Sequence, residues 1–174
     1  MADVNEHRPI RLPATLLGIG LGGAVDGIVL HQLLQWHHLL TSTGRHPATT
    51  VAGLEANTLA DGLFHVVAYA FVIAGVAMLW SRTRRPIAQT WRSLVGYGAV
   101  GWGLFNLVEG VVDHHLLELH HVREVADPLP YDLAFLAVGA TLLLAGWMVA
   151  RSDRSTPSRA RSSSTDPPRR PLKR

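Results

Sequence analysis

Histidines and carboxylates are concentrated in two stretches of an otherwise apolar sequence. Residues 26–38 read DGIVLHQLLQWHH and residues 109–121 read EGVVDHHLLELHH, and the two stretches align without a gap. Each begins with an acid, has a histidine five residues later and ends in a histidine pair. Imidazole and carboxylate groups together can bind a metal ion, form a buried polar network or carry protons. Any function has to account for both copies.

The composition is that of a membrane protein. Of the 174 residues, 48% are hydrophobic and only 17% are charged, whereas a soluble domain has about 25% charged residues. The absence of cysteine excludes disulfides and thiolate metal sites. The pI of about 9.9 comes largely from the tail after Ala150. A basic tail beside a membrane favours anionic lipid headgroups as partners, and we expect no nucleic acid.

Four apolar segments are each near the ~20 residues that a membrane-spanning helix needs. Glycine is frequent inside them, and in lipid small residues let helix backbones approach closely. The sequence therefore predicts an all-α integral membrane protein, a bundle of four transmembrane helices. The predicted helices span residues 13–40, 58–80, 93–115 and 131–150 of a transmembrane domain at 13–150, between a cytoplasmic arm at 1–12 and a disordered basic cytoplasmic tail at 151–174.

Arginine placement predicts the orientation. Arginines cluster before residue 12, between residues 82 and 92, and after residue 150, whereas the other two loops have only Arg45 and Arg123. Loops rich in Lys and Arg stay in the cytoplasm. Both termini and the middle loop of this multi-pass protein are therefore expected in the cytoplasm.

This topology gathers the titratable residues at one depth. The first helix leaves the cytoplasm near Arg11 and reaches the outer interface about 20 residues later, near His31. The second and fourth helices enter from outside and open with related motifs, DGLF at 61–64 and DLAF at 132–135. With the longer repeat, this predicts two duplicated helical hairpins related by a pseudo-two-fold axis along the membrane normal.

The spacing inside the repeat does not suit a regular α-helix. Asp26 and His31 are five residues apart, as are Glu109 and His114, whereas residues three or four apart share a helix face. Either a π-bulge or partners from neighbouring helices would be needed to bring them together. The sequence leaves both alternatives open.

A carboxylate beside an imidazole, with an amide in reach, has the composition of a metal site and its supporting residues. We expect Asp61, His65, Glu109 and Asp113 to converge, joined by His31 or His114. The candidate metal ligands are Asp26, His31, Asp61, His65, Glu109, Asp113 and His114. The candidate residues that orient these ligands are Asn57, Asn106, Gln35, His37, His38, His120 and His121.

Imidazole with carboxylate suits a divalent transition metal, namely Zn, Fe, Mn or Cu(II). Haem held by two histidines of facing helices is an alternative cofactor. A structural polar network and a proton or ion pathway remain alternatives to a metal site. If the protein is an enzyme, in which the metal activates water or oxygen, Glu109 and Asp61 are the candidates for moving protons.

The motifs DGIVLHQLLQWHH, NTLADGLFH and FNLVEGVVDHHLLELHHVR resemble those of a bacterial family of small predicted membrane proteins. The family is catalogued as domain of unknown function two-two-four-three. The resemblance covers roughly residues 13–150 and implies a four-helix inner-membrane protein. Family members that look fused or adjacent to a cytochrome oxidase copper-assembly domain imply metal handling. Beside a metalloenzyme, the resemblance thus suggests a non-catalytic metal-handling or oxidase-assembly protein, in a homo-oligomer or a respiratory membrane complex.

Overall fold

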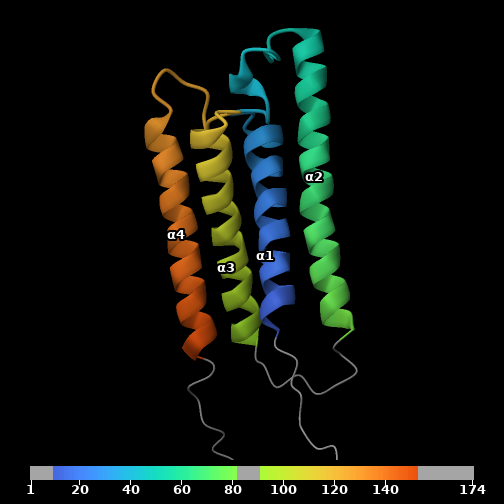
Figure 1. Ribbon diagram of the computed structural model, residues 1–174, viewed down its shortest axis with the longest axis vertical. Coiled ribbons are helices and arrows are strands. Elements are labelled where there is room, and N and C mark those ends of the chain that lie inside the picture. Colours follow the sequence, from blue (N-terminus) through green and yellow to red (C-terminus); the bar gives the residue numbers. More distant parts are fainter. Residues whose placement is uncertain (1–9, 82–90, 153–174) are drawn as a thin grey trace, which may run out of the picture.

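Four long helices lie side by side in the order α4, α3, α1 and α2 (Figure 1). The computed structural model describes residues 10–81 and 91–152, and this part of the chain contains helices and no strand. Helix α1 contacts α2 and α3, and α3 in turn contacts α4. The helices are α1 (Arg11–Asp26), α2 (Val51–Trp80), α3 (Trp91–Glu109) and α4 (Leu129–Ser152), with π-helices η1 (Gly27–Leu33) and η3 (Gly110–Leu116) after α1 and α3 and a 3₁₀ turn, η2 (Thr41–Thr43).

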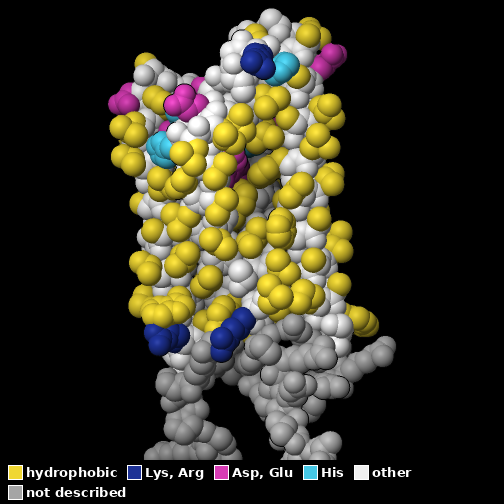
Figure 2. Space-filling model, viewed as in Figure 1, with side chains coloured by type: hydrophobic (Ala, Val, Ile, Leu, Met, Phe, Trp, Pro, Cys, Tyr) yellow, Lys and Arg dark blue, Asp and Glu magenta, His cyan; other side chains and the backbone are white. Residues whose placement is uncertain are grey.

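All four helices are long and apolar enough to cross a membrane. The spans comprise 23, 30, 26 and 24 residues, counting η1 with α1 and η3 with α3. Large hydrophobic side chains face outward, whereas the largest fully buried side chains are mostly histidine, asparagine and aspartate. This is the inverse of a soluble protein. Figure 2 shows the hydrophobic band, with histidines, acids and a basic side chain at its upper end and further basic side chains at its lower end.

The first helix ends earlier than the sequence suggested. It was expected to continue to Leu40, but the helical backbone stops at Leu33. The reason is Gln35, which has a φ of 48°, in the left-handed region where a helix cannot continue. Glu118, at the same position of the second copy, has a φ of 47°. The residues after Gln35 and Glu118 are therefore in loops. The histidine pairs His37–His38 and His120–His121 thus lie in these loops and not on helices.

The second helix begins earlier than predicted, at Val51 and not near residue 58. Thr50 caps it, because the Thr50 hydroxyl accepts a hydrogen bond from the backbone N–H of Gly53. A threonine N-cap of this kind stabilises a helix start by about 1 kcal/mol. The third and fourth spans, Trp91–Leu116 and Leu129–Ser152, lie close to the predicted ranges.

Glycines bring the two central helices into backbone contact. A Cβ atom on Gly18 of α1 would overlap the carbonyl oxygen of Gly98 in α3, and one on Gly101 would overlap that of Thr15. Small residues at such crossings are the usual means of packing helices in lipid. The expected packing of the first and third helices against each other is observed, and it brings the two repeated stretches together.

Candidate metal centre

The π-helices explain the five-residue spacing of acid and histidine. Both repeated stretches leave the α-helix directly after the acid, at Gly27 and at Gly110. Hydrogen bonds in a π-helix run from residue i to i+5, so that residues five apart share a face. In η1 this places His31 Nε2 3.3 Å from Asp26 Oδ2. The π-helical alternative from the sequence is thus realised, and neighbouring elements supply further partners.

Two interleaved loops form a cap over the ends of the π-helices. We define this cap as residues 34–50 and 117–128. The backbone N–H of Ser42 donates to Leu119 O at 2.9 Å, and that of Glu124 donates to Trp36 O at 3.2 Å. The Arg123 guanidinium lies over the rings of Trp36 and of Tyr131 in α4, 5.1 and 5.3 Å from their centroids. Each loop is therefore held by the other half of the chain.

The cap carries two histidines into the interior. His37 and His120 are 2% and 0% exposed, and their rings stack with centroids 4.4 Å apart. The Nδ1–H of His37 donates to Val122 O at 2.8 Å, and that of His120 donates to Leu39 O at 3.3 Å. Each ring is thus oriented by the opposite loop. These hydrogen bonds leave His37 Nε2 without a partner, while His120 Nε2 lies 3.2 Å from His114 Nε2, within hydrogen-bonding distance.

Asp61 of α2 orients the first half of the site. Its carboxylate accepts hydrogen bonds from His31 Nδ1 at 2.9 Å and from His38 Nδ1 at 2.7 Å. It also accepts one from the backbone N–H of Leu39, at 2.9 Å. A carboxylate that binds the outer nitrogen of an imidazole fixes its tautomer and points the other nitrogen at a metal.

Asp132 of α4 plays the same part in the second half. Its carboxylate accepts hydrogen bonds from His121 Nδ1 at 2.8 Å and from the backbone N–H of Val122 at 2.9 Å, and lies 3.6 Å from His114 Nδ1. Asp132 was not among the candidate residues. The signal that could have revealed it is the similarity of the DLAF and DGLF motifs that open the two outer helices.

Six buried side chains form the candidate centre between the π-helices and the cap. They belong to three overlapping groups, each with three ligand atoms within 4.8 Å of one another. His31, His120 and Glu109 are each shared by two groups, so the three groups form one continuous cluster. The groups are His31 with His37 and His120, Glu109 with His114 and His120, and Asp26 with His31 and Glu109.

Polar atoms of this cluster lack hydrogen-bond partners among the described residues. They are Asp26 Oδ2, His31 Nε2, His37 Nε2, His114 Nδ1 and both carboxylate oxygens of Glu109. An unmatched buried polar group costs roughly 1–3 kcal/mol, so a concentration of them calls for an explanation. Asp26 and Glu109 are also two carboxylates in one buried group, and like charges so close repel each other. A cation would relieve both penalties, and the donor set fits one.

The chain matches the model of one known protein family. Residues 13–153 match the family described as Predicted membrane protein (DUF2243). The chain belongs to this family. No curated protein and no solved structure matches it. The resemblance inferred from the motifs is confirmed, and the family description agrees with the four candidate spans.

In this DUF2243 member the two buried histidines of the cap, His37 and His120, are neutral at neutral pH. Burial, together with the nearby His31, lowers the pKa of His37 to about 4. Burial and the neighbouring His37 and His114 also hold the pKa of His120 well below its usual value. Only a neutral imidazole has a free lone pair for a metal. Both side chains are therefore in the form that binds metal.

Other predicted ligands lie outside the three groups. His65 is half-buried, and its Nδ1–H donates to the backbone oxygen of Asp61 at 2.8 Å. Its ring lies against Gly27, where an added Cβ would come within 2.5 Å of it. Asp113 is half-buried and lines a pocket beside Glu109. The structure brings together Asp26, His31, Glu109 and His114 of the predicted set, with Asp61 directly behind His31.

The residues predicted to orient the ligands have separate roles. Asn57 holds the cap, because it accepts from the Leu40 N–H and donates to His46 O. Asn106 is buried and lines a small pocket with Asp26. Gln35 makes the exposed turn after η1. His38 and His121 bind Asp61 and Asp132, while His37 and His120 are themselves in the candidate ligand set.

Proposed function

We propose that this protein binds a divalent transition metal in the cluster described above. The observation that carries the proposal is the arrangement of imidazoles: His31, His37 and His120 each direct Nδ1 to a protein acceptor and contribute to one group of ligand atoms. Histidines that ligate metals are held in this way. Asp26 and Glu109 add the negative charge that a divalent cation neutralises.

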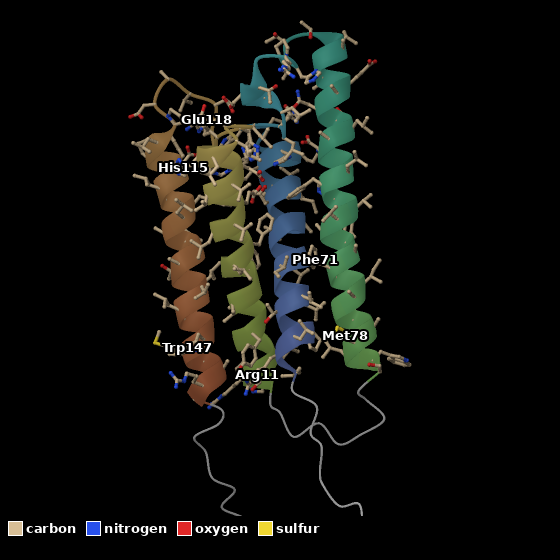
Figure 3. All side chains as sticks on the ribbon, in the orientation of Figure 1. Arg11, Phe71, Met78, His115, Glu118 and Trp147 are labelled. Atoms are coloured by element: carbon tan, nitrogen blue, oxygen red, sulfur yellow. The ribbon has the colours of Figure 1, made fainter. Side chains whose placement is uncertain are left out.

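The donor set favours a metal ion over haem. Nitrogen and oxygen donors suit Zn, Fe, Mn or Cu(II), whereas soft Cu(I) prefers sulfur. The chain has no cysteine, and Met78 lies at the opposite end from the cluster (Figure 3). The His37 and His120 rings stack directly, with an interplanar angle of 12°. Such packing suits a small ion and leaves no gap for a porphyrin between these two rings.

Elemental analysis of the full chain, purified in detergent without chelator, tests this function. We expect stoichiometric Zn, Fe, Mn or Cu, and no absorption band of haem in the visible spectrum. A metal centre releases its ion on chelation and regains it when the metal is returned. If the protein contains neither metal nor haem and takes up none of the four metals, the proposal is wrong, and the cluster is a structural polar network instead.

We further propose that the metal centre faces the extracytoplasmic side of a bacterial inner membrane, with both termini in the cytoplasm. Arg11 and Trp147 lie at one end of the helices, and His115 and Glu118 at the other (Figure 3). In the sequence, most arginines precede α1, fall between α2 and α3 or follow α4. Because positively charged segments remain inside, the cap and the cluster are assigned to the outer face.

Reporter fusions test this orientation. An enzyme that is active only outside the cytoplasm should be active when fused after Ala126, in the cap, and silent when fused after Arg85. The expected contrast is nearly complete, since the positive-inside bias sets one orientation for the whole chain. The opposite pattern would place the cluster on the cytoplasmic side.

We also propose that the two hairpins, α1 with α2 and α3 with α4, arose by duplication and are related by a pseudo-two-fold axis. Three equivalences support this. The π-helices begin and end at aligned residues, the turns after them share the left-handed conformation at aligned positions, and Asp61 and Asp132 bind aligned histidines. The copies differ at His65, since Leu136 packs against Gly110 where His65 packs against Gly27.

A further inference from the structure

An apolar pocket of about 320 Å³ opens on the flank of the molecule beside the metal cluster. Its outer wall includes Val67 and Val108, which are 57% and 53% exposed on the surface that faces lipid. Figure 2 shows an acidic side chain in a recess among hydrophobic side chains. Three of the four phenylalanines of the sequence line the pocket: Phe64, Phe71 and Phe105.

The inner end of this pocket is polar. Glu109 is 4% exposed and lines the pocket, and neither of its oxygens has a hydrogen-bond partner among the described residues. Its Oε1 lies 3.8 Å from His120 Nε2, while a carboxylate has four acceptor positions on its two oxygens. Glu109 therefore borders both the metal cluster and the pocket, and its carboxylate has unused acceptor positions. Asp113 provides a second carboxylate beside it.

The direct route from the aqueous side is covered. The interleaved cap lies above the cluster, and its own His37 and His120 are almost fully buried. The flank pocket, in contrast, reaches Glu109 through a wall of phenylalanine, valine and leucine. A molecule that arrives at the cluster through this pocket must therefore dissolve in the membrane.

We propose that the pocket binds a membrane-soluble aromatic molecule with a ring hydroxyl, of the phenol or quinol class. The ring packs among Phe64, Phe71 and Phe105, since aromatic side chains favour stacked or edge-on contacts with another ring. The hydroxyl donates to Glu109, and an alkyl tail leaves past Val67 and Val108 into lipid. This site goes beyond the proposed metal centre, with which it shares Glu109, and binding there does not require the metal.

Binding of 4-decylphenol to the full chain in lipid nanodiscs tests the site. We expect saturable binding of one molecule per chain above the level in empty nanodiscs. Val67→Trp should weaken this binding roughly tenfold, because the larger side chain fills the pocket mouth. Val66→Trp is the matched control, since Val66 is 65% exposed on the same helix and does not line this pocket. Val108→Trp and Val111→Trp form an equivalent pair on the third span.

Two further measurements separate this site from the metal centre. Decylbenzene, which has the same apolar body without the hydroxyl, should bind much more weakly, and equal binding would overturn the assigned ligand class. Metal content measured on the same samples should not change in Val67→Trp. Stoichiometric metal without saturable phenol binding would overturn the pocket alone, whereas phenol binding by a protein without metal would overturn the metal centre alone. Equal effects of Val66→Trp and Val67→Trp on 4-decylphenol binding would show that the probe associates with the protein surface non-specifically, and would overturn the pocket.

Discussion

Replacing His120 by alanine should reduce the bound metal to less than about a tenth of the wild-type content, because even residues that only orient ligands change metal affinity by about 10–100-fold. His120 belongs to two of the three ligand groups and is fully buried. Elemental analysis of the purified variant measures the loss. His115→Ala is the matched control, since His115 is exposed in η3 of the same repeat and belongs to no group.

A second pair of variants tests which ligand set is used. His37→Ala should also lose the metal, because His37 completes the group with His31 and His120. His65→Ala should retain the metal, because the His65 ring packs against Gly27 and its Nδ1–H donates to the backbone oxygen of Asp61 in the same helix. The reverse result, with metal lost from the His65 variant and kept in the His120 variant, would mean that His65 is a ligand and His120 is not, as the sequence analysis predicted.

Gly18→Ala should destabilise the protein by about 1–3 kcal/mol, the range seen when side chains are forced into tightly packed cores. The added methyl group would overlap the backbone of Gly98, and a backbone cannot rotate away as a flexible side chain can. The central helices α1 and α3 would have to separate. Thermal unfolding in detergent, followed by circular dichroism, should show a lower midpoint.

The opposite glycine of this contact is the control. A Cβ on Gly98 would meet only Ala14 O, at 3.9 Å, which is an ordinary contact. Since alanine favours the helix over glycine by up to about 1 kcal/mol, Gly98→Ala should be neutral or stabilising. Equal midpoints for the two variants would contradict the close crossing of α1 and α3.

Helix number and location could be predicted from the sequence because they depend on composition over about 20 residues. The shared depth of the acids and histidines followed from the same counting. The end of the first helix could not be predicted, because it depends on one backbone angle at Gln35, and glutamine has no strong preference for that region. The positions of His37 and His38 changed with it.

The candidate ligand set was harder to predict than the fold. His31, His114, Asp26 and Glu109 follow from the repeat and its spacing. His37 and His120 reach the cluster only because each loop crosses to the other half of the molecule, and such a crossing depends on contacts between residues far apart in the sequence. His65 and Asp113 have suitable chemistry and depth, but helix rotation directs them elsewhere.

The crossed hydrogen bonds of the cap bear on the ancestry of the protein. His37 uses a carbonyl of the second hairpin and His120 a carbonyl of the first, so neither hairpin alone can satisfy its own histidine. Two identical hairpins would satisfy both at once, since contacts across a two-fold axis are made twice. Under the duplication proposed above, a two-helix ancestor would therefore have needed a second copy of itself to hold these two histidines.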